Sequence, residues 1–164
     1  MLTQPKCWIT SHPSGPPRRI PGMTTYNSIS RSATRRHLNT PVGFAFGAVF
    51  VLVGLTGFVV SNGHHAIGQD GGKLLGVFQV NVVHNLVHLA VGAVMIGAAI
   101  AGARAARAVN LLFGVVYLVV FGFGLFALGS SLNFLALNGA DNGLHLALGT
   151  VLTGVGLLSR STPR

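Results

Sequence analysis

The sequence contains no glutamate, and its only acidic residues, Asp70 and Asp141, stand against eleven lysines and arginines. Only 8% of its 164 residues are charged and 50% are hydrophobic, whereas a soluble domain carries about 25% charged residues. This shortage of charge excludes an ordinary soluble enzyme and indicates a membrane protein. Cys7 is the single cysteine, which excludes a disulfide framework and a thiolate metal cluster.

The positive charge lies at the ends of apolar runs. Arginines precede the first run, stand between two of the runs and follow the last. This distribution is typical of the positive-inside rule and not of a nucleic-acid surface, where basic residues cluster to neutralise phosphates. We therefore expect the lipid bilayer, and no nucleic acid, as the partner.

Residues 1–40 differ from the rest of the chain. Five of the seven prolines fall within the first twenty-two positions, and no apolar periodicity is present. Such a segment cannot bury enough surface to offset its chain entropy, so we predict a disordered, basic N-terminal tail. We also expect translation to begin at Met23.

Residues 41–160 are predicted to form an all-α, polytopic domain of four transmembrane helices. The runs lie at about 41–60, 82–103, 108–128 and 139–158. Twenty helical residues span roughly 30 Å, the thickness of a bilayer core. The apolar stretch Leu74–Val80 is expected to lie along the outer interface or to dip into the bundle, because Asn81 marks a helix start.

The basic residues also predict the orientation. Four crossings place seven arginines, Arg31, Arg35, Arg36, Arg104, Arg107, Arg160 and Arg164, on one side and Lys73 on the other. We therefore expect both termini in the cytoplasm and the protein in the plasma membrane.

The second and fourth runs are related by a shift of 57 residues. Eight of the seventeen positions from Asn81 to Gly97 are identical to those from Asn138 to Gly154. The first and third runs match more loosely, as Phe50 with Tyr117. The sequence therefore predicts a duplicated helical hairpin.

Each copy carries a polar stripe on one helical face. The eight residues are Asn81, His84, Asn85 and His88, and then Asn138, Asp141, Asn142 and His145. Polar groups at that depth are costly against lipid, so both stripes are expected to face the interior and each other.

Several roles are open for the stripes. Asparagines at helix starts favour capping, with Asp141 completing a capping box, and the deeper groups are suited to hydrogen bonds across the bundle. His88 and His145 at equal depth suit bis-histidine haem ligation. There are two further alternatives. One is a metal site formed by His84, His88, Asp141 and His145, and the other is a proton or small-solute pathway.

The segments LLGVFQVNVVHNLVHLAVG (74–92) and LNGADNGLHLALG (137–149) resemble a family of small actinobacterial four-helix membrane proteins known as a domain of unknown function. The resemblance covers about residues 40–158 and implies fold and location without chemistry. With no nucleophile elbow or catalytic triad order in the chain, we expect no enzyme. The leading expectation is a structural or interaction component, with a membrane-protein partner or homo-oligomer left open.

Overall fold

The computed structural model describes residues 38–158, which form four helices and one two-stranded sheet. In chain order the elements are α2 (Asn39–Ser61), β1 (Gly72–Leu74), β2 (Phe78–Val80), α3 (Val82–Ala101), α4 (Ala103–Ala127) and α5 (Gly139–Leu158). The predicted disorder of the tail up to residue 37, and the Met23 start, lie outside the described residues. Residues 39 and 40, which we assigned to that tail, instead belong to α2.

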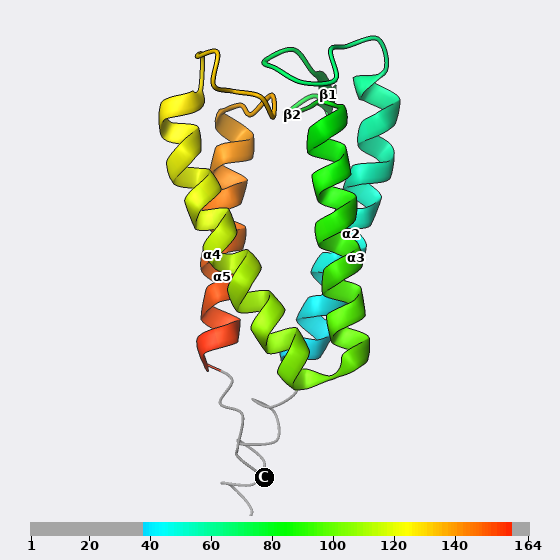
Figure 1. The fold of residues 1–164 in the computed structure, drawn as a ribbon, viewed down its shortest axis with the longest axis vertical. Helices are drawn as coiled ribbons and strands as arrows, with labels where there is room; N and C mark the ends of the chain where they lie inside the picture. The colour runs from blue at the N-terminus through cyan, green and yellow to red at the C-terminus, as the bar shows by residue number, and fades with distance from the viewer. Residues whose placement is uncertain (1–37, 159–164) are drawn as a thin grey trace, which may run out of the picture.

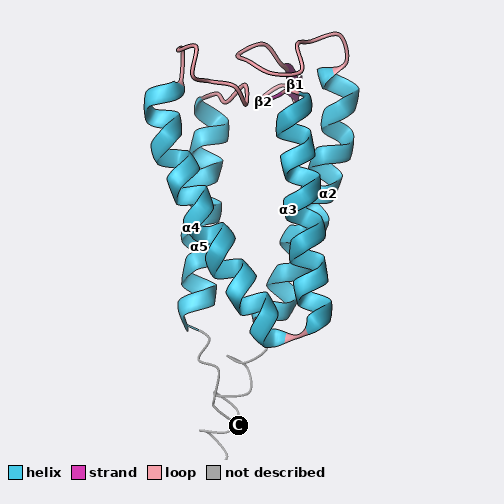
Figure 2. Ribbon diagram, viewed as in Figure 1, coloured by secondary structure: helices cyan, strands magenta, loops and turns pink. Residues whose placement is uncertain are grey.

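The helices form two antiparallel hairpins, α2 with α3 and α4 with α5 (Figure 1). The start of α2 and the end of α5 lie at one face of the bundle, which we call the terminal face. The connections within each hairpin lie at the opposite face, the loop face, where the two strands are also found (Figure 2). The hairpins approach each other most closely where α3 turns into α4.

Three helices, α2, α3 and α4, are long and apolar enough to cross a membrane. The described part of the chain therefore supports the membrane protein that the composition predicts. Helix α5 has twenty residues but is not among the three, since its first turns carry Asp141, Asn142 and His145.

Small residues let the two helices of each hairpin pack closely. A Cβ on Gly47 of α2 would lie 3.0 Å from the carbonyl oxygen of Gly92 in α3. A Cβ on Gly149 of α5 would lie equally close, 3.0 Å, to the carbonyl oxygen of Gly114 in α4. Within lipid, helices associate by such close van der Waals packing, because lipid tails are as apolar as the side chains.

An apolar core joins the hairpins between the two faces. Its buried members come from all four helices and are Phe50, Val91, Met95, Tyr117 and Leu152. Met95 and Leu152 are wholly inaccessible to solvent. The middle of the bundle is therefore a packed apolar layer.

The turn between α3 and α4 is tighter than we expected. The sequence placed the end of one helix at Ala103 and the start of the next at Ala108, but Gly102 alone separates them. Its φ of 112° reverses the chain, and its N–H donates to the carbonyls of the last turn of α3. Arg104 and Arg107 consequently lie in the first turns of α4.

The stretch before α3 contains a β-hairpin, which the sequence did not predict. β1 and β2 are antiparallel, with Gly72 opposite Val80 and Leu74 opposite Phe78. Leu75 and Gly76 have φ values of 52° and 73°, and a type I′ turn requires positive φ at both of its central residues. The N–H of Val77 donates to the carbonyl oxygen of Leu74 and closes this turn. The stretch Leu74–Val80 is thus occupied mainly by this hairpin, and α3 begins only at Val82.

Candidate functional site

The stripe residues nearest the loop face cap α3 and α5. Asn81 Oδ1 accepts a hydrogen bond of 2.9 Å from the N–H of His84. Asn138 Oδ1 accepts from the N–H of Asp141, and Asp141 Oδ2 accepts in return from the N–H of Asn138, both at 3.0 Å. The capping box predicted at Asn138 is therefore present.

The same capping residues tie each hairpin to the loop of the other. Asn81 Nδ2 donates to the carbonyl of Phe134 in the α4–α5 loop at 2.8 Å. Asn138 Nδ2 donates to the carbonyl of Val77 in the β1–β2 turn at 2.7 Å. Asp141 Oδ2 also accepts from the N–H of Gln79 in β2 at 3.1 Å. We call these three hydrogen bonds the cross-loop ties.

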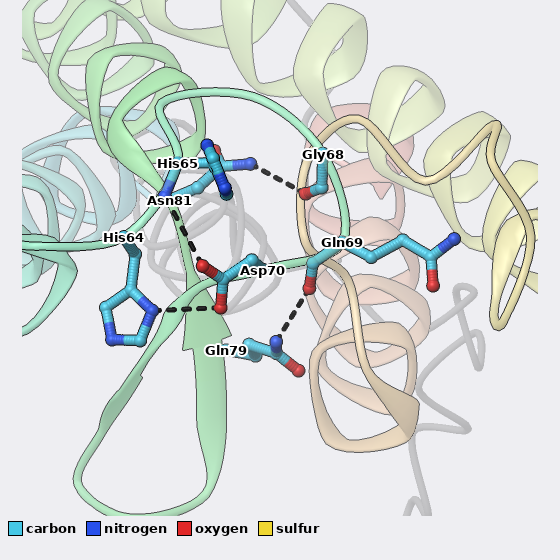
Figure 3. A network of polar contacts seen from close by, with 7 residues as sticks. All are labelled: His64, His65, Gly68, Gln69, Asp70, Gln79 and Asn81. Carbon is cyan, nitrogen blue, oxygen red and sulfur yellow. Dashed lines mark hydrogen bonds and ion pairs between the residues drawn. The ribbon is translucent and has the colours of Figure 1, made fainter.

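A second network orders the connection between α2 and α3 (Figure 3). His64 Nδ1 lies 2.9 Å from Asp70 Oδ1, and the His65 N–H donates to Asp70 Oδ2. The hydrogen bond with His64, followed by that with the His65 backbone, lowers the pKa of Asp70 below its usual 3.8. Gln79 Nε2 donates to Gln69 O at 2.8 Å, which joins this loop to β2.

Beneath the cross-loop ties, five rings from all four helices form a closed circuit, which we call the ring cluster. His84 stacks on His88 with ring centroids 4.7 Å apart, and His88 stacks on Phe50 at 5.6 Å. Phe50 stacks on Tyr117 and Tyr117 on His145, both at 5.4 Å, and His145 returns to His84 at 6.3 Å. The imidazoles of α3 and α5 thus lie together inside the bundle, each less than a tenth exposed.

The hydrogen bonds of Asn85 and Asn142, the two asparagines below the caps, differ from our expectation. We expected hydrogen bonds across the bundle, but Asn85 Nδ2 donates to Ser61 Oγ of its own hairpin at 3.0 Å. The carboxamide of Asn85 lies against Gly57, and that of Asn142 lies against Gly124. Each carboxamide therefore faces a glycine on the neighbouring helix of its own hairpin.

Several polar atoms of the site are buried without a hydrogen-bond partner among the described residues. They are Nδ1 of His84, His88 and His145, together with Oδ1 of Asn85, Asn110 and Asn142 and Oγ1 of Thr153. His84 additionally contacts the backbone of Gln79 and Leu135 through its imidazole. Buried polar groups are nearly always paired, so the three imidazole nitrogens are an exception within this bundle.

The arrangement does not favour the cofactor alternatives. Phe50 and Tyr117 stack between His88 and His145, so the two imidazoles do not face each other across a slot for a porphyrin. Within residues 38–158, no group of three or more His, Cys, Asp and Glu side chains is placed to hold a metal ion. The metal site suggested for His84, His88, Asp141 and His145 is therefore not formed.

One polar contact between the hairpins at the terminal face was not predicted from the sequence. Asn110 Nδ2 of α4 donates to Asn39 of α2, to its carbonyl oxygen at 3.1 Å and its Oδ1 at 3.0 Å. Both side chains are buried. The available signal was an isolated asparagine within the third apolar run, since such a group rarely faces lipid.

Comparison with known proteins leaves the activity open. A family model described as a domain of unknown function, DUF4383, matches residues 42–158. No curated protein and no solved structure matches the chain.

Proposed function

The chain belongs to the DUF4383 family of unknown function, and we propose that it is a non-enzymatic structural or interaction component of the plasma membrane. The observation that carries this proposal is the reciprocal capping of the two hairpins. Asn81 caps α3 while binding the loop of α4–α5, and Asn138 caps α5 while binding the turn before α3. The outer half of each stripe is thus used to hold the hairpins together.

The apolar core favours a structural or interaction component over a proton or solute carrier. The ring cluster is bounded on its inner side by Met95 and Leu152, which are wholly buried. A proton or solute pathway needs polar groups or water through the full thickness of the bundle. No such series of groups links the ring cluster with Asn110 among the described side chains.

We further propose that α5 is a fourth crossing and that both termini are cytoplasmic. α5 runs antiparallel to α4 along its length (Figure 1), and its polar groups face inward. Arg104 and Arg107 lie at the terminal face, and Lys73 lies at the loop face. This distribution of charge favours a cytoplasmic terminal face.

A gene duplication is our explanation for the matched contacts of the two hairpins. Phe50 stacks on His88 in one hairpin as Tyr117 stacks on His145 in the other. The pairing of Asn85 with Gly57 is repeated by Asn142 with Gly124. The members of these pairs match after shifts of 57 residues for α3 to α5 and 67 residues for α2 to α4.

Purified protein in lipid nanodiscs and proteoliposomes tests the function. We expect a colourless, folded protein that conducts neither protons nor small solutes, and a lower melting temperature in the Asn81→Ala/Asn138→Ala double variant. Asn62→Ala, an exposed position at the end of α2, is the matched control and should melt like the parent. A Soret band lost in both His88→Ala and His145→Ala, or flux that depends on Asp141, would contradict the proposal.

Cysteine accessibility tests the orientation. In a Cys7→Ser background, Leu75→Cys at the β1–β2 turn should react with an impermeant maleimide on intact cells. Arg104→Cys at the opposite face should react only after the membrane is permeabilised. The reverse pattern would place the termini outside.

A further inference from the structure

The three buried imidazoles lie at the contact between the hairpins on the loop side of the bundle. His84 and His88 belong to α3, whereas His145 belongs to α5. The rings of His84 and His145 are 6.3 Å apart across this contact. A charge placed on one ring therefore acts directly between the two halves of the molecule.

Each of these imidazoles has a nitrogen available to take up a proton. Nδ1 of all three is buried and has no hydrogen-bond partner among the described residues. A neutral imidazole has one bare ring nitrogen in either tautomer and can accept one proton there. Burial disfavours the charged ring, so proton uptake is favoured by a movement that exposes the imidazoles to water. The three rings together are thus a built site for a small number of protons.

The other titratable groups that face the cluster are few. Helix α4 contributes Tyr117, whereas Phe50, the ring from α2, does not titrate. From β2 and from the α4–α5 loop, the backbone of Gln79 and Leu135 contacts the His84 imidazole. Of the two carboxylates among the described residues, Asp141 lies one helical turn before His145 in α5, and its Oδ2 already accepts two backbone hydrogen bonds. A second positive charge in the cluster would therefore lack a matching negative one.

The ring cluster has a polar side, which faces the loop end of the bundle. The residues above it are polar and belong to the cross-loop ties, whereas Met95 and Leu152 close the opposite side. We propose that the imidazoles of His84, His88 and His145 form a proton-binding site that senses acidification at the loop face, and that proton uptake separates the loop ends of the two hairpins. The like charges repel across the contact, while the Gly102 turn and the Asn39–Asn110 contact hold the terminal ends together.

This inference rests on the proposed bundle but not on its orientation, because a nanodisc exposes both faces to the buffer. Spin labels are attached in a Cys7→Ser background at Leu75→Cys and Leu132→Cys, which are exposed positions in the loops of different hairpins. Pulsed electron spin resonance should show a longer or broader distance distribution at pH 5 than at pH 8. Labels at Ile100→Cys and Leu157→Cys, near the terminal face, should report no change.

Two histidine variants separate the cluster from other acid effects. His84→Gln/His145→Gln should abolish the distance change, whereas His65→Gln, an exposed loop histidine, should retain it. In parallel, ¹⁵N resonances of labelled histidine should show proton uptake by the buried imidazoles over the same pH range as the distance change. A constant distance in the parent protein, a change that persists without the two imidazoles, or proton uptake in a different pH range would overturn the proposal.

Discussion

The carboxamide of Asn85 lies where a side chain on Gly57 would stand, so α2 and α3 meet at a point that admits no Cβ. The same relationship joins Asn142 to Gly124 between α5 and α4. A buried asparagine is accommodated in each hairpin because the facing helix presents only backbone.

Gly57→Ala should therefore destabilise the protein. The new methyl group displaces the Asn85 side chain and breaks its hydrogen bond to Ser61, at a cost of about 1–3 kcal/mol. Thermal unfolding in detergent measures the loss. Gly97→Ala in α3, where an added Cβ meets nothing within 4 Å, is the control and should be neutral or stabilising. Equal melting temperatures for the two variants would show that the Asn85–Gly57 contact is not tight.

Asp141→Ala should destabilise the loop side of the bundle by about 1–3 kcal/mol, since it leaves two backbone donors without an acceptor. Those donors are the N–H groups of Asn138 and Gln79. Asp141→Asn keeps one side-chain oxygen and should lose less. Hydrogen exchange of the β2 amides provides the measurement, with faster exchange expected in the alanine variant. Unchanged exchange at Gln79 would contradict the cross-loop tie.

Asn110→Ala should weaken the contact of the hairpins at the terminal face. It removes both hydrogen bonds to Asn39, in a site where each side chain is buried, and we expect a loss of about 1–2 kcal/mol. Melting temperature is again the measurement, with Asn62→Ala as the control. If the melting temperature of Asn110→Ala is no lower than that of this control, the Asn39–Asn110 contact contributes nothing to stability.

The Asp70 carboxylate should titrate below 3.8, and His64→Ala should raise its pKa towards that value. A folded-state pKa below the unfolded value means that the contribution to stability is present above the unfolded pKa. It is lost as the pH falls through the lowered folded pKa. Because both side chains are exposed, the effect on stability should be small. Carbon-13 NMR of the labelled carboxyl gives the pKa directly, and a value at or above 3.8 would be inconsistent with the His64 contact.

Much of the bundle was predictable because its signals are local. A twenty-residue apolar run without charge has to satisfy its backbone internally, which requires a helix. Asparagine before an apolar run marks a helix start, and α3 begins at Val82 directly after Asn81. The β-hairpin was not predictable in this way, because Leu75 adopts a left-handed conformation that leucine rarely takes.

The candidate site likewise has one part that was predictable from the sequence and one part that was not. Local spacing alone placed His84 and His88 on one helical face and predicted the capping box of Asn138 with Asp141, because a helix brings residues three and four apart together. Which ring contacts which was decided by the tertiary structure, since Phe50 and Tyr117 reach the imidazoles only once four helices pack. The partner of Asn85 was also decided there, because a hydrogen bond forms with the nearest group after packing, and Ser61 ends the helix alongside. Composition and periodicity determine that this chain enters the membrane as helices, whereas the meeting of its imidazoles depends on contacts between residues far apart in the chain.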